Sequence, residues 1–276
     1  MKNCPVQLGR SAKPPWWLRA GAALVFVAAW FALSGSARAD FKVYVFDDGV
    51  LARTFSATTG TSVSTGEFNT PDFHVGDIGI GIVATSNSPG NQIAAKTTDL
   101  TFLATNTTGS AHTLTVAVSD INFINPSSAG LRLMGAMTVN WGSHTGENSN
   151  PADSLQYQGF VNLDNKQFAS NVDPTTIGQI GSAPNTVSTT KLSLNSTGGG
   201  TTGAANSPDV VFSHPPGAYS ISGVLTINLI GGDALEATGD SNVFPTPAPG
   251  GWVVWGSCVP ALALVGWVRS RRRLAV

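Results

Sequence analysis

The chain has 276 residues and a formal net charge of −1, but its charges are unevenly distributed. All 16 acidic residues lie between positions 40 and 240, together with six of the 15 basic residues, so this middle region carries a net charge of −10. That charge excludes nucleic acid as a partner, because the region would repel phosphates. Both cysteines, Cys4 and Cys258, lie outside the region, which excludes disulfides and thiolate chemistry within it.

The N-terminal segment has the organisation of a signal peptide. Residues 20–33 form an apolar core of 14 residues, which is too short to cross a bilayer comfortably. Ala37 and Ala39 supply small residues at the positions read by signal peptidase. We predict cleavage before Asp40, so that residues 1–39 are removed; the alternative is an uncleaved N-terminal anchor helix. The basic residues before the apolar core are Lys2, Arg10, Lys13 and Arg19.

The middle region, residues 40–243, which we call the body, alternates apolar and polar residues. In the stretch 112–119, for example, Leu114, Val116 and Val118 fall on one face. Alternation of this kind is typical of strands with one buried and one solvated face. The predicted strands are 41–46, 77–83, 99–105, 112–119, 131–141, 156–163, 187–194 and 220–229.

The connections between these segments also favour strands. Asp48-Gly49 predicts a tight turn after the first strand. The loop 106–110 joins two of the clearest strands, so residues 99–119 are predicted to form a hairpin. No stretch of the body shows sustained helical spacing with caps. We therefore predict an all-β fold, with one antiparallel β-sandwich between the signal peptide and a single C-terminal hydrophobic helix.

The body lacks the common catalytic and metal-binding motifs. It has no Gly-x-Ser-x-Gly elbow and no His-Glu-x-x-His sequence. Its four histidines are far apart in the sequence, and we interpret each as a surface or turn residue. Asp47 and Asp48 are interpreted as the start of a turn rather than as calcium ligands, because the spaced oxygen ligands of a calcium loop are missing. The histidines are His74, His112, His144 and His214.

These observations predict no enzyme activity, no metal and no cofactor. A hydrolase with a carboxylate site outside the known motifs remains a third hypothesis, since the sequence alone does not show which carboxyl groups meet.

Trp141 is the only tryptophan of the body and is the last residue of an apolar predicted strand. An exposed indole at a strand end would suit stacking on the apolar face of a sugar ring. The alternative is a tryptophan packed at the rim of the core.

The C-terminal segment, residues 244–276, combines prolines, an apolar run and arginines. Residues 251–268 carry no charge, and a helix of this length would be about 27 Å long, close to the hydrocarbon thickness of a bilayer. Positive charge just after a span holds that end in the cytoplasm. We therefore predict that the body lies outside the membrane and the chain end inside, which is the topology of a plain single-span anchor. The arginines are Arg269, Arg271, Arg272 and Arg273.

The motif Pro245-Thr246-Pro247, the apolar run and the arginine cluster together resemble the PEP-CTERM sorting signal of bacterial exported proteins. The resemblance implies recognition by a membrane-embedded exosortase, removal of the tail, and release or attachment at the cell surface of bacteria that make exopolysaccharide. Residues 98–123 and 218–228 also resemble β-rich exported proteins that carry such tails, which implies their architecture and export.

The sequence therefore predicts a non-enzymatic exported protein of the cell surface or extracellular matrix. Its expected partners are signal peptidase, an exosortase-like membrane enzyme, the membrane before processing, and exopolysaccharide. The alternative function is a carbohydrate-binding or adhesive module that uses strand-end loops near Trp141.

Overall fold

The structure is a computed structural model. It describes residues 40–57, 62–65, 73–75, 78–142, 152–197 and 201–246. The predicted signal peptide and the apolar run 251–268 lie outside the described residues. Within the described part of the chain, no helix is long and apolar enough to cross a membrane.

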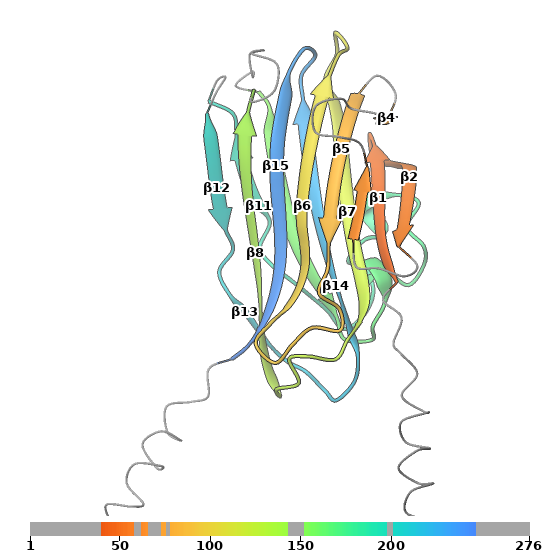
Figure 1. Cartoon of the computed structure of the whole chain (residues 1–276), viewed down its shortest axis with the longest axis vertical. Helices are drawn as coiled ribbons and strands as arrows, with labels where there is room; N and C mark the ends of the chain where they lie inside the picture. Colours follow the sequence, from red (N-terminus) through yellow and green to blue (C-terminus); the bar gives the residue numbers. More distant parts are fainter. Residues whose placement is uncertain are drawn as a thin grey trace, which may run out of the picture. The chain divides into compact units, whose positions relative to one another are not determined.

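The body folds into two antiparallel sheets packed face to face, as the alternation predicts (Figure 1). The first, sheet A, has the order β10-β9-β14-β7-β1-β2, with β11 also pairing with β9. Its strands are β1 (Phe41–Asp47), β2 (Val50–Ala57), β7 (His112–Phe123), β9 (Ser154–Asn162), β10 (Thr186–Ser188), β11 (Leu192–Asn195) and β14 (Tyr219–Leu229).

Sheet B has the order β12-β8-β15-β6-β5-β3, with β13 on β8 and β4 on β5, and lies in front of sheet A in the view of Figure 1. Its strands are β3 (Ser62–Thr65), β4 (Phe73–Val75), β5 (Ile78–Thr85), β6 (Ala95–Asn106), β8 (Gly130–Trp141), β12 (Thr202–Asn206), β13 (Val210–Ser213) and β15 (Ala234–Pro245).

The inward faces of the two sheets form the core. The alternating residues Leu114, Val116 and Val118 of β7 are buried there, as are Leu225 and Ile227 of β14. Burying these side chains against the facing sheet stabilises the sandwich, at roughly 1.5–3 kcal/mol for each fully buried aliphatic side chain.

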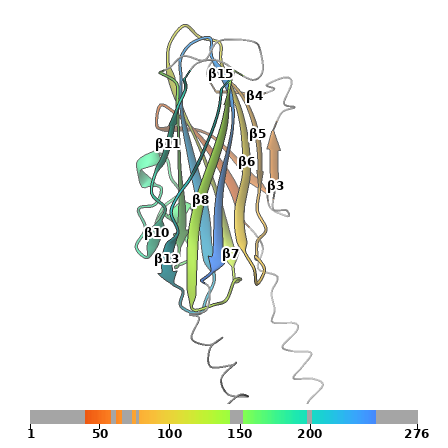
Figure 2. The ribbon, with the colours of Figure 1, turned by 90° about the vertical axis from the view of Figure 1, so that its left-hand side faces the viewer.

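The outer face of sheet A is partly covered, which the sequence did not indicate. The segment 163–185, with the 3-10 turns η1 (Gln167–Ala169) and η2 (Ile177–Gln179), lies outside this sheet (Figure 2). Phe168 and Ala169 pack on outward-facing residues of β1, β7 and β14. Strand β7 is consequently buried on both faces over much of its length, whereas we predicted one solvated face.

Two of the predicted connections differ from the structure. Strands β6 and β7 do not form a hairpin: β6 pairs with β5 and β15, whereas β7 pairs with β1 and β14. The loop after β6 crosses between the sheets, and the side chain of Asn106 holds it by donating to Ser110 O and Leu229 O at 2.8 and 2.9 Å. The predicted strand 187–194 is two short strands, β10 and β11, which both pair with β9.

The turn at Asp48-Gly49 is confirmed. Both residues have positive φ, 47° and 84°, which is the geometry of the two-residue hairpin turns that match strand twist. Asp47 and Val50 are paired on either side of the turn.

Candidate functional site

Trp141 does not form the expected glycan contact. It is the last residue of β8, its side chain is 2 % exposed, and it belongs to the main hydrophobic cluster. The stacking hypothesis for Trp141 is therefore wrong, because a ring with so little accessible surface cannot lie on a sugar. The alternative, a tryptophan packed in the core near a strand end, is confirmed.

The structure instead forms a cleft on the outer face of sheet A, which we call the β9–β14 cleft. Its volume is about 160 Å³. Two pairs of cross-strand neighbours form its floor: Gln158 of β9 is paired with Val224 of β14, and Gln156 of β9 with Thr226 of β14. The period of two places these side chains outward while the residues between them point into the core. The lining residues are Gln156, Tyr157, Gln158, Phe160, Ile177, Ile180, Lys191, Val224 and Thr226.

The η2 segment forms one wall of this cleft. Ile177 and Ile180 of this segment pack on the apolar cluster that includes Phe160. The segment is tied down at its start, where Gln179 Oε1 accepts from the backbone N–H of Thr175 at 2.6 Å and Thr176 at 3.2 Å. Because these hydrogen bonds hold the wall in place, the cleft is already formed in the folded chain.

The polar groups of the cleft are amides, a hydroxyl and one ammonium group. Gln158 Nε2 donates to Thr189 O at 3.0 Å, and Thr189 Oγ1 accepts from the backbone N–H of Gly159 at 3.0 Å. The hydrogen bond to Thr189 orients the Gln158 side chain through its Nε2 group, so that its Oε1 atom can accept hydrogen bonds from a ligand. Lys191 is the one charged residue among the described residues of the lining, which include no carboxylate and no imidazole.

A wider groove lies on the outer face of sheet B. It has a volume of about 600 Å³ and is lined by residues of β8, β12 and β15, including Asn140, Thr238 and Glu236. Thr138 Oγ1 and Thr238 Oγ1 are 2.6 Å apart, so the hydroxyls on this face satisfy one another in part. Among the described residues that line the groove, Glu236 is the one carboxylate.

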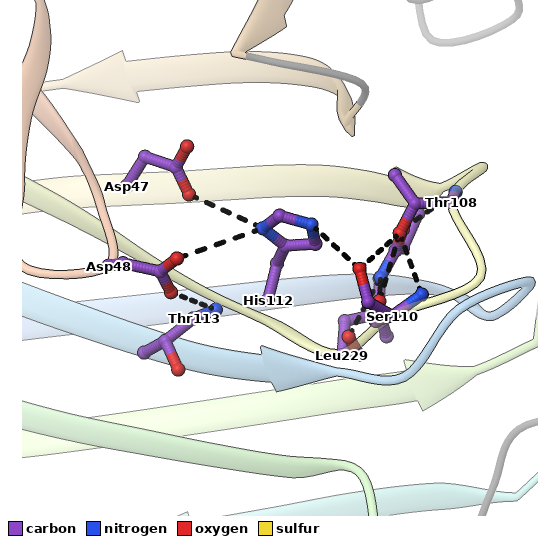
Figure 3. A network of polar contacts seen from close by, with 8 residues as sticks. Asp47, Asp48, Thr108, Ser110, His112, Thr113 and Leu229 are labelled. Carbon is purple, nitrogen blue, oxygen red and sulfur yellow. Dashed lines mark hydrogen bonds and ion pairs between the residues drawn. The ribbon is translucent and has the colours of Figure 1, made fainter.

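The histidines have different environments. His74 is exposed, and His144 lies outside the described residues. His214 is 9 % exposed, packs edge-on against Tyr219, and its pKa is lowered by burial. His112 lies beside Asp47 and Asp48 (Figure 3), an arrangement that sequence reasoning missed because His112 is far from them along the chain.

The predicted processing residues lie at the edges of the described chain. Asp40 directly precedes β1, while Ala37 and Ala39 are outside the described residues. Pro245 is the last residue of β15, and Thr246 donates its backbone N–H to Gly130 O at 3.0 Å. The folded region thus continues past the predicted boundary at 243. The remaining residues of the predicted sorting signal, Pro247, Arg269, Arg271, Arg272 and Arg273, lie outside the described residues.

No protein-family model matches the chain, and no curated protein matches it. Solved structures with a similar architecture include a family 61 carbohydrate-binding module in complex with β-1,4-galactotriose, with a TM-score of 0.29, 9 % identity, and coverage of 59 % of this chain and 87 % of that one. A mannan-binding family 27 module has a TM-score of 0.25, 10 % identity, and coverage of 67 % and 90 %.

A xylan-binding family 22 domain has a TM-score of 0.25, 9 % identity, and coverage of 69 % and 98 %. At this level of similarity, neither the fold nor the ligands of these modules are carried over to this chain.

Proposed function

We propose that this chain is a non-enzymatic exported protein of the cell surface or extracellular matrix, and that its body binds polysaccharide in the β9–β14 cleft. The observation that carries the binding proposal is the lining of the cleft. It combines an apolar wall, Phe160, Ile177 and Ile180, with outward amides, a hydroxyl and an ammonium group. Sugar rings present the complementary surface, with apolar C–H faces and hydroxyl edges.

The size of the cleft favours a polymer over a free small molecule. A volume of about 160 Å³ is below the range of roughly 300–1,000 Å³ that is usual for small-molecule sites. A cleft of this size accepts one unit of a chain that continues over the sheet surface. Lys191 adds a positive charge, so an acidic unit such as a uronic acid is favoured over a cationic one.

The same lining supports binding without catalysis. Hydrolysis of a glycosidic bond requires a carboxylic acid and a second carboxylate around the scissile bond. The described residues that line the β9–β14 cleft include neither group.

Affinity electrophoresis of the chain through gels containing neutral and uronic-acid polysaccharides tests the binding proposal. We expect retardation in at least one polysaccharide, and a loss of at least tenfold in affinity for Gln156→Ala and Lys191→Ala. Asn140→Ala in the groove of sheet B is the matched control and should behave as the unmodified chain. Retardation that is lost in Asn140→Ala but kept in both cleft variants would contradict the assignment of the cleft. Release of reducing ends from the polysaccharide would contradict the non-enzymatic proposal.

We also propose that the ends of the chain are processed. Signal peptidase would cut between Ala39 and Asp40, and an exosortase-like membrane enzyme would recognise Pro245-Thr246-Pro247 with the arginine cluster. In support of the first cut, β1 begins at Phe41, so removal of residues 1–39 leaves the strand intact. Until the tail is removed, it would hold the protein in the membrane with its C-terminus in the cytoplasm.

Mass spectrometry of the protein from its native host tests the processing proposal. We expect a chain that begins at Asp40 and lacks Arg269 to Val276. A chain that retains Val276 would favour a plain single-span anchor over sorting.

A further inference from the structure

Three metal-ligating side chains meet at one end of the sandwich. Asp47 and Asp48 come from the β1–β2 turn, and His112 is the first residue of β7. The antiparallel pairing of β1 with β7, in which Asp47 is paired with Leu114, brings them together. One potential ligand atom from each residue lies within 4.8 Å of the other two. We call these three residues the carboxylate–imidazole cluster.

Both carboxylates face the same ring nitrogen (Figure 3). His112 Nδ1 is 3.8 Å from Asp47 Oδ1 and 3.9 Å from Asp48 Oδ2. These separations are too long for hydrogen bonds. Asp47 Oδ1 and His112 Nδ1 are shielded from solvent and have no hydrogen-bond partner among the described residues. Since shielded polar atoms in proteins are nearly always partnered, their convergence on one point requires an explanation.

Contacts with neighbouring residues orient the side chains of His112 and Asp48 in the cluster. His112 Nε2 is 3.4 Å from Ser110 Oγ, which in turn is 3.3 Å from Thr108 Oγ1. If Nε2 carries the proton and donates to Ser110, Nδ1 presents its lone pair to the two carboxylates. Asp48 Oδ1 accepts from the backbone N–H of Thr113 at 3.1 Å, which leaves Oδ2 to face the histidine. Ligating histidines and carboxylates commonly have such outer partners.

We propose that the carboxylate–imidazole cluster binds a divalent transition-metal ion of the Zn²⁺ class, through His112 Nδ1 and one oxygen from each aspartate, with water completing the coordination. An ion placed between atoms at these separations would be about 2.2–2.5 Å from each, so a movement of a few tenths of an ångström gives the usual Zn–N and Zn–O distances of about 2.0–2.2 Å. The imidazole decides against Ca²⁺ and Mg²⁺, which take oxygen ligands. The bound ion would link the β1–β2 turn to the start of β7.

Equilibrium dialysis of the full-length chain in detergent, after treatment with EDTA, measures Zn²⁺ binding directly. We expect His112→Gln and Asp47→Asn each to bind one equivalent less than the unmodified chain at micromolar free Zn²⁺. His74→Gln, which removes an exposed histidine from sheet B, is the matched control and should bind the same amount as the unmodified chain. Equal binding by all four chains would overturn the proposal.

Two further measurements separate loss of the site from loss of the fold. Zn²⁺ should raise the melting temperature of the unmodified chain and of Asp48→Glu, which keeps a carboxylate, but not that of His112→Gln. All variants should retain the far-ultraviolet circular dichroism of the unmodified chain, because the side chains of Asp47 and His112 are 30 % and 26 % exposed. In ¹⁵N spectra the Nδ1 resonance of His112 should shift with Zn²⁺. A stabilisation by Ca²⁺ that persists in His112→Gln would instead identify an oxygen-only site and refute the nitrogen ligand.

Discussion

The buried carboxyl group of Asp120 should make the stability of the body depend on pH, and Asp120→Asn should remove that dependence. Asp120 lies on β7 and is 0 % exposed. Its Oδ1 accepts from the backbone N–H of Ile121 at 2.8 Å, whereas Oδ2 is shielded and has no hydrogen-bond partner in the described part of the chain. Burial raises the pKa of Asp120 from 3.8 to about 6; hydrogen bonds from Ser86 and Ile121 oppose this, and the Asp40 carboxylate adds to it.

The sign follows from proton binding. Between pH 4 and 6 the unfolded chain has released the Asp120 proton, while the folded chain still holds it. The free energy of unfolding therefore falls as the pH rises through this window. The shift corresponds to a loss of about 2 kcal/mol between pH 4 and pH 7. This is a large share of the roughly 5–15 kcal/mol that a domain typically has.

Urea unfolding of residues 40–246, followed by circular dichroism from pH 4 to pH 8, measures the effect. The quantity to plot is the unfolding free energy of Asp120→Asn minus that of the unmodified chain. This subtraction cancels other titrating groups, including His214, whose lowered pKa acts in the opposite direction. We expect the difference to rise by about 2 kcal/mol across the range. A difference that stays constant with pH would refute the assignment of the titration to Asp120.

Three further variants test the packing of the body. Gly239→Ala should lower the free energy of unfolding in urea by about 1–3 kcal/mol, because its Cβ would lie 2.6 Å from the Tyr157 ring. The control, Gly178→Ala, should leave the free energy of unfolding unchanged, because no described residue other than its chain neighbours has an atom within 4 Å of the added Cβ. Trp141→Ala should cost about 3–5 kcal/mol without changing polysaccharide affinity per folded chain, and lost affinity at full folding would restore Trp141 to the site. His214→Gln should reduce the loss of stability as the pH falls below 6.5, and an unchanged acid limb would exclude His214 as its cause.

Of the four twelve-residue strands, the sequence predicted β6, β7 and β8 in large part and missed β15, whose central inward positions are small. Leu235 and Val243 of β15 point into the core, but Gly239 and Ser241 between them give no hydrophobic signal. Tyr157 of β9 fills the space above them: its hydroxyl is 2.7 Å from Ser241 Oγ, and its ring lies against Gly239. When a small residue on one strand packs against a large residue on another, the hydrophobic pattern of either strand alone does not reveal the contact.

The predicted β6–β7 hairpin was wrong for a related reason. A polar loop containing glycine between two alternating strands looks the same whether the strands pair or lie in opposite sheets. What distinguishes the two here is the side chain of Asn106, which is buried and bonds to Leu229 O of β14. That contact involves a residue more than a hundred positions away, so no local pattern reports it.

Only part of the carboxylate–imidazole cluster and of the β9–β14 cleft could be predicted from the sequence. The turn at Asp48-Gly49 is local and was predicted, whereas the approach of His112 depends on the register of β1 against β7. The β9–β14 cleft depends on the η2 segment, whose short irregular turns have no periodicity to detect. The binding hypothesis was based on Trp141, the single tryptophan of the body. A large aromatic residue at the end of an apolar strand is, however, more often packed into the core.

Both described ends of the chain lie at one end of the sandwich, where β1 begins and β15 finishes (Figure 1). Twelve-residue strands such as β7 and β15 carry the fold about 40 Å from there to its opposite rim. The Asp48-Gly49 turn follows the other end of β1, away from Asp40 and Thr246 and toward the opposite rim. An ion bound by the carboxylate–imidazole cluster would therefore lie far from both described ends of the chain, and an attachment through either end would leave it accessible.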